Sequence, residues 1–101
     1  MGTRYEKGRR FEYERKRFWE KAGHDVWRSA GSHGLFDITT VDPLGTITLI
    51  QCKVVGDSTE GNRLLRNFKK SPPLGHRPYA KYHQVMEVKV SGSREVLSVR
   101  V

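Results

Sequence analysis

Residues 28–53 constrain the fold of this chain more than any other stretch, because polar side chains interrupt two apolar segments there. Residues 36–41 and 47–54 are rich in β-branched and large apolar residues and flank the turn-forming sequence Asp-Pro-Leu-Gly, which predicts a β-hairpin. Asp37 stands at the start of the first strand, and the triplet Gln-Cys-Lys at 51–53 stands near the end of the second. Because such strands normally bury hydrocarbon, these polar residues indicate a functional site.

The alternation of side chains along a strand makes this a statement about register. Gln51 and Lys53 share one face of the second strand, whereas Cys52 points to the other face and into the core. Asp37 lies opposite Gln51 only if residues 42–46 form the loop of the hairpin. A loop shorter by one residue would move Asp37 to the other register and separate it from the site unless a bulge intervened.

An amphipathic helix is predicted before this hairpin. Residues 5–22 form the helix, and Gly23 closes it because glycine readily adopts the left-handed cap conformation. A short strand follows at 24–29, with Arg28 emerging at its end, and then a polar, glycine-containing loop at 30–34. The apolar stripe of the helix recurs at helical spacing and consists of Phe11, Phe18, Trp19 and Ala22.

The second half of the chain predicts a further helix and a further hairpin. Residues 59–70 form a helix anchored by Leu64, Leu65 and Phe68, and the proline-rich segment 71–78 cannot continue it. Residues 84–90 and 95–101 alternate around Ser-Gly-Ser and predict two antiparallel strands. Nothing divides the chain, so we expect one domain, residues 1–101.

Charge indicates the class of partner. The 101 residues include 19 Lys and Arg against 11 Asp and Glu, a net charge of +8, which favours a polyanion. The single cysteine excludes an internal disulfide and suggests a reducing compartment. Without an apolar run of about 20 residues or a signal-peptide core, no membrane association and a cytoplasmic location are expected.

Oxygen donors predict a metal-dependent phosphodiester hydrolase. A hard divalent cation can be held by the Asp37 carboxylate, the Gln51 amide oxygen and the backbone carbonyl of Cys52. Glu12 lies on the flank of the helical stripe and would add a second carboxylate, while Glu14 on the opposite flank stays open as an alternative. Lys53 would orient or deprotonate the attacking water.

These residues resemble a known family. Asp37 followed by Gln51-Cys52-Lys53 is similar to the core of the PD-(D/E)xK nuclease superfamily, in the version where glutamine replaces the acidic residue. Together with Lys-Gly-Arg-Arg-Phe-Glu at 7–12 and Arg-Ser-Ala-Gly-Ser at 28–32, residues 5–55 more narrowly resemble the archaeal-type Holliday junction resolvases.

The resemblance implies an α/β (α+β) fold with a restriction-endonuclease-like core, a central mixed sheet flanked by helices. It also implies a homodimer that depends on Mg²⁺, with Mn²⁺ as a substitute, and makes paired nicks across four-way DNA junctions. Carried over by position, the catalytic residues are Glu12, Asp37, Gln51, Lys53 and Ser32. Gln51 departs from the family by removing one negative charge, which should weaken the affinity for metal.

Candidate DNA contacts come from the basic residues and the loop, and we expect at least one cluster to bind the DNA backbone. They are Arg9, Arg10, Arg28, Ser32, His33, Arg63, Arg66, Lys69 and Lys70. A zinc site is not expected, because the four histidines lack paired short spacings.

Other interpretations stay open. Taken alone, Asp37 could cap a turn, and Lys53 could be a lysine that extends into solvent from the end of a strand. Glu12 could form a surface ion pair with Lys16. The chain could also be a restriction-like or Mrr-like DNA endonuclease, or a non-catalytic basic nucleic-acid-binding protein.

Overall fold

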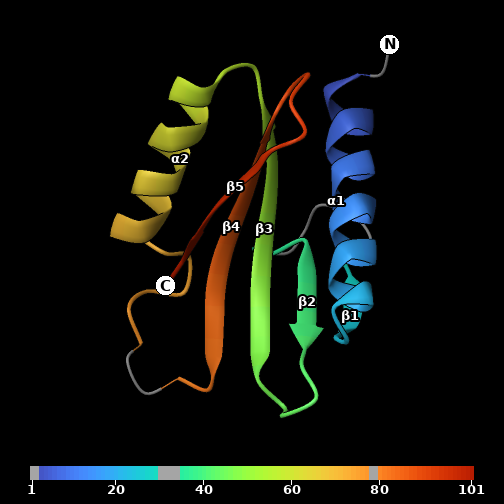
Figure 1. The fold of residues 1–101 in the computed structure, drawn as a ribbon. Coiled ribbons are helices and arrows are strands. Elements are labelled where there is room, and N and C mark those ends of the chain that lie inside the picture. The colour runs from blue at the N-terminus through green and yellow to red at the C-terminus, as the bar shows by residue number, and fades with distance from the viewer. Residues whose placement is uncertain (1–2, 30–34, 78–79) are drawn as a thin grey trace.

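The computed structural model describes residues 3–29, 35–77 and 80–101. The chain has an α+β fold in which a five-stranded sheet of order β1-β2-β3-β4-β5 lies between two helices (Figure 1). The elements are α1 (Arg4–Lys21), β1 (Asp25–Arg28), β2 (Ile38–Val41), β3 (Ile47–Val55), α2 (Ser58–Lys70), β4 (Tyr82–Val90) and β5 (Val96–Arg100). The sheet is mixed: β3 and β4 are parallel, and the other neighbours are antiparallel. This confirms the expectation of a mixed sheet flanked by helices.

Along Ile38–Val41, the register between β2 and β3 is the predicted one. Val41 pairs with Ile47, so the loop is residues 42–46, and the ladder ends at the pair formed by Ile38 and Ile50. The predicted pair of Asp37 with Gln51 is not formed: the Asp37 N–H donates to the carbonyl of Ile50 over 2.9 Å, one residue short of Gln51, as in a β-bulge. β2 begins at Ile38, two residues later than predicted, so Asp37 precedes the strand.

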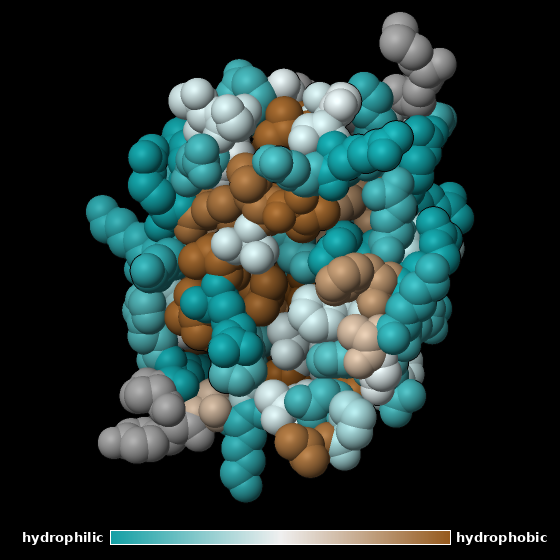
Figure 2. Space-filling view, in the orientation of Figure 1, coloured by the Kyte–Doolittle hydropathy of each residue, from teal (hydrophilic) through white to brown (hydrophobic). Residues whose placement is uncertain are grey.

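The two helices pack against opposite faces of the sheet. On the α1 face, one core consists of Phe11, Ile38, Ile50, Cys52 and Val85. On the α2 face, a second core consists of Val55, Phe68, Met86 and Val88. α1 contacts β1, β2 and β3, whereas α2 contacts mainly β4 and β5, so each helix covers one half of the sheet. Figure 2 shows apolar side chains gathered between the hydrophilic flanks that the helices form.

Part of the predicted stripe on α1 is wrong. Phe11 is buried and Trp19 packs against the same core, but Phe18 is 49% exposed and Ala22 is exposed. The inward position between Phe11 and Trp19 belongs to Arg15, which donates two hydrogen bonds of 2.9 Å to Glu87 of β4. This pair turns α1 so that Phe18 lies outside, where the Arg15 guanidinium covers its ring at 4.0 Å.

The remaining predicted elements are present. α1 begins after Thr3, whose hydroxyl accepts from the Glu6 N–H, and ends before Gly23, which has a φ of 94°. α2 begins after Asp57, whose carboxylate accepts from the Glu60 N–H. β4 and β5 form the antiparallel pair expected at the end of the chain. Among the described residues no helix is long and apolar enough to cross a membrane.

Candidate active site

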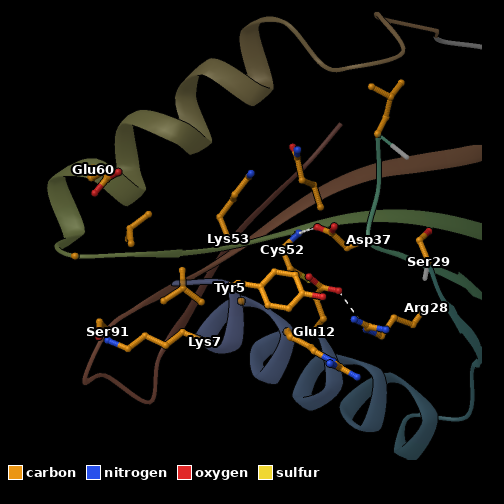
Figure 3. A pocket seen from close by; sticks show the side chains of 17 residues that line it. Tyr5, Lys7, Glu12, Arg28, Ser29, Asp37, Cys52, Lys53, Glu60 and Ser91 are labelled. Atoms are coloured by element: carbon orange, nitrogen blue, oxygen red, sulfur yellow. Dashed lines mark hydrogen bonds and ion pairs between the residues drawn. The ribbon is translucent and has the colours of Figure 1, made fainter. Parts of the chain in front are cut away.

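The candidate site lies where β2 and β3 separate. β3 continues to Val55, but its ladder with β2 ends at the pair formed by Ile38 and Ile50. A hollow of about 530 Å³, here called the main hollow, opens beside this uncovered part of β3. Its lining comes from α1, the end of β1, the segment just before β2, the second half of β3, the beginning of α2 and the turn after β4 (Figure 3). The predicted residues that line it are Glu12, Asp37, Gln51, Cys52 and Lys53.

Asp37 is held in place by the backbone of β3. Its Oδ2 accepts a hydrogen bond of 2.8 Å from the Cys52 N–H, which leaves Oδ1 for another partner. Because the N–H and C=O of one strand residue point to the same edge, the Cys52 carbonyl also faces this uncovered edge. The Cys52 side chain is buried in the α1-side core, as predicted, and burial raises the pKa of its thiol. Cys52 therefore offers the site its backbone and not its sulfur.

Glu12 brings a second carboxylate to the hollow from α1. Burial and the nearby negative charge of Asp37 raise its pKa above the ordinary value of 4.5, and Arg28 opposes this shift. Arg28 Nε lies 3.2 Å from Glu12 Oε1, and the two side chains are only 17% and 19% exposed. The Arg28 Nε is buried and makes no aligned hydrogen bond to a described residue. The pair is therefore held by charge more than by hydrogen bonding.

The choice between Glu12 and Glu14 follows from the two flanks of α1. Glu14 does not line the main hollow and forms an ion pair with Lys89 of β4 at 3.3 Å. Glu12 is thus the helix carboxylate that shares a hollow with Asp37.

The site residues reach the hollow from both sides of the sheet. Gln51 and Lys53 are on the α2 face of β3, and Figure 3 shows Lys53 extending from β3 towards α2, while Glu12 approaches on the side of α1. They share one hollow only because β2 ends before it can cover the edge of β3. The sequence predicted that Asp37, Gln51 and Lys53 share a face. Gln51 and Lys53 do, but the Asp37 carboxylate lies at the edge of β3, on the Cys52 N–H, and Glu12 approaches from the α1 side.

The predicted DNA contacts are spread over the molecule. Arg9 and Arg28 line the main hollow, whereas Arg10 lines a neighbouring one. Arg63, Arg66, Lys69 and Lys70 are exposed on α2 and line neither hollow. The predictions for Ser32 and His33 lie outside the described residues.

Several lining residues were missed. Tyr5, which is 67% exposed, precedes Glu12 by seven positions on α1, so helical spacing could have placed it on the same side. Figure 3 shows its ring beside Glu12. Glu60 and Ser91 come from distant parts of the chain, and no sequence pattern links them to Asp37.

The oxygen atoms that line the main hollow suit a hard divalent cation. Two carboxylates, the amide of Gln51 and the Cys52 carbonyl are all oxygen donors, which suits a hard divalent ion such as Mg²⁺. Within residues 3–29, 35–77 and 80–101 there is no cluster of three His, Cys, Asp or Glu side chains, so Glu12 and Asp37 would carry the charge of such a site.

Comparison of the chain with family models, with curated proteins and with solved structures gives no significant match.

Proposed function

We propose that this chain is a divalent-cation-dependent DNA endonuclease that cleaves four-way junctions. The observation that supports this most is the meeting of Asp37 and Glu12 in one hollow, at the edge of a strand that also carries Gln51 and Lys53. The four-way junction as substrate and the homodimer as assembly are proposed from the resemblance of residues 5–55 to the junction resolvases. The net charge of +8 supports a polyanionic substrate.

In this proposal each residue has a definite task. Asp37 and the Cys52 carbonyl, which lie at one edge of β3 because of the Asp37–Cys52 hydrogen bond, would hold the cation together with Glu12. A bound Mg²⁺ would activate a water and offset charge on the scissile phosphate. Lys53 orients that water or the phosphate from the α2 side. Gln51 would offer a neutral oxygen where the family has a carboxylate, so the site carries one negative charge fewer.

The substrate is tested with DNA of different shapes. Labelled four-way junctions, linear duplexes with the same arm sequences and flaps are incubated with the protein in Mg²⁺, Mn²⁺ or EDTA. We expect paired nicks in the junction with either metal and none in EDTA. Cleavage of the linear duplex at the same rate would contradict the resolvase function and would support a restriction-like endonuclease instead.

A non-catalytic nucleic-acid-binding protein is the second candidate. It is favoured by glutamine at 51 and by the pairing of Glu12 with Arg28, which neutralises one of the two carboxylates. Junction binding without cleavage in any divalent cation would support this candidate and contradict the first.

A further inference from the structure

A second hollow continues from the main one along α1. It measures about 130 Å³ and shares Lys7, Val54 and Ser91 with the lining of the main hollow. Its other lining residues are Arg10, Phe11, Glu14, Lys89 and Gly92. The two hollows therefore form a continuous depression between α1 and the β4–β5 turn.

The charges along this depression are not balanced. Its cations are Lys7, Arg9, Arg10, Arg28, Lys53 and Lys89, and its carboxylates are Glu12, Glu14, Asp37 and Glu60. Arg28 and Lys89 are paired with Glu12 and Glu14. Lys7, which lines both hollows, and Arg10, which lines only the second, take part in no ion pair between described residues. Arg9 and Lys53 of the main hollow are likewise in no such pair, so a ligand that extends from the main hollow into the second one would meet unpaired cations along its whole length.

By sequence alone, the cations of α2 compete for the same role. Arg63, Arg66, Lys69 and Lys70 are exposed and repeat at helical spacing. However, α2 meets the main hollow at Glu60, and at about 1.5 Å per residue the helix carries these four side chains progressively away from it. They offer phosphate contacts only to DNA that lies apart from the candidate site.

We propose that the sugar-phosphate backbone of the bound strand follows the joined hollows, and that Lys7 and Arg10 contact phosphates adjacent to the one beside Asp37. This inference rests on the proposed function, because it takes the main hollow as the place of the scissile phosphate. Ser91 lines both hollows from the side of the β4–β5 turn, across from Lys7. Its hydroxyl can donate a hydrogen bond to the phosphate that Lys7 contacts. The α1 side is therefore the DNA-contacting face close to the site.

The test compares two double variants that remove the same charge from exposed or half-buried helix positions. They are Lys7→Ala/Arg10→Ala and Lys69→Ala/Lys70→Ala. Binding of a fluorescent four-way junction is measured by anisotropy in EDTA over a series of salt concentrations. Each lost phosphate contact lowers the slope of log K against log salt by about 0.9, so the α1 double variant should lose nearly two units of slope. The α2 double variant should retain the wild-type slope.

An unchanged slope in the α1 double variant, or an equal or larger loss in the α2 double variant, would overturn the inference. Thermal denaturation checks folding, and Lys7→Gln/Arg10→Gln replaces the alanine pair if that variant is unfolded. Because binding is measured in EDTA, a protein that binds through Lys7 and Arg10 but never cuts would refute the endonuclease function alone. A protein that cuts without using these residues would refute this inference alone.

Discussion

Arg28 lies beside the Glu12 carboxylate, where a bound cation would also lie. Its guanidinium lies 3.2 Å from Glu12 and stacks over the Tyr13 ring at 4.5 Å. Arg28→Gln removes a positive charge that competes with the cation, so we predict that Mg²⁺ or Mn²⁺ binds about tenfold tighter, equivalent to about 1.4 kcal/mol. Isothermal titration calorimetry measures this without DNA.

The same variant should bind DNA more weakly, because Arg28 also lines the hollow proposed for the phosphate. Arg28→Lys keeps the charge and serves as the control, with cation affinity close to that of the wild type. Weaker cation binding by Arg28→Gln would mean that Arg28 supports the shape of the site and does not compete for it.

Glu12 should leave a signature in the pH dependence of stability. Its pKa in the folded protein is raised above 4.5, so its contribution to stability is fully present below the unfolded-state pKa and is lost as pH rises through the folded-state pKa. Glu12→Gln is neutral throughout and lacks this loss. We therefore predict that Glu12→Gln gains stability relative to the wild type between about pH 4 and about pH 7. Chemical denaturation at both pH values measures the difference, and a constant or reversed difference would contradict the raised pKa.

At the scale of residues, the turn and the alternation along strands were enough to predict the pairing along β2, but not the shift of one residue at Asp37. The five-residue loop determined the register, and the Asx-type bonds from the Leu44 and Thr46 N–H groups to Asp42 stabilise it. The pair of Glu12 and Arg28 could not be predicted, because it depends on how α1 is placed over β1. That placement is a tertiary property without a local signal.

At the scale of elements, the ion pair of Arg15 on α1 with Glu87 on β4 should account for much of the stability of the α1 face. Glu87 is 3% exposed and its partner Arg15 is 14% exposed at the side chain. Arg15→Ala would leave a buried carboxylate without a partner, at a cost of about 3–5 kcal/mol in the free energy of unfolding. Urea denaturation monitored by circular dichroism gives this value.

Lys16→Ala is the matched control for Arg15→Ala. It breaks the exposed pair with Glu20 one position further along the same helix, at a cost of about 0.5 kcal/mol or less. Equal effects of the two variants would show that the Glu87 carboxylate is not dependent on Arg15.

The existence of every helix and strand could be predicted from periodicity and turn residues, but the inward side of α1 could not. A stripe of Phe11, Phe18, Trp19 and Ala22 fits helical spacing as well as the observed inward set of Phe11, Arg15 and Trp19 does. Glu87 decides between them, because a carboxylate buried in β4 needs a cation, and only one orientation of α1 supplies Arg15.

At the scale of the whole molecule, the fold brings together residues that lie far apart in the chain. α1 and β3 lie on either side of a gap that exists because β2 is short, and the beginning of α2 closes one end of it. Composition predicted a basic protein with a polyanionic partner, but it did not distinguish the α1 surface from the α2 surface. The distinction depends on which cations share a hollow with Asp37 and Glu12.

The measurement that tests this account most directly is the single-turnover rate at which the wild type and Asp37→Asn cleave a labelled four-way junction in Mg²⁺. Asparagine keeps an oxygen for the Cys52 N–H and removes the charge, so the fold and the binding of DNA should persist. We predict cleavage by the wild type that EDTA abolishes, and a rate at least about 100-fold lower for Asp37→Asn. Cleavage by Asp37→Asn at the wild-type rate, or cleavage that survives EDTA, would contradict the account.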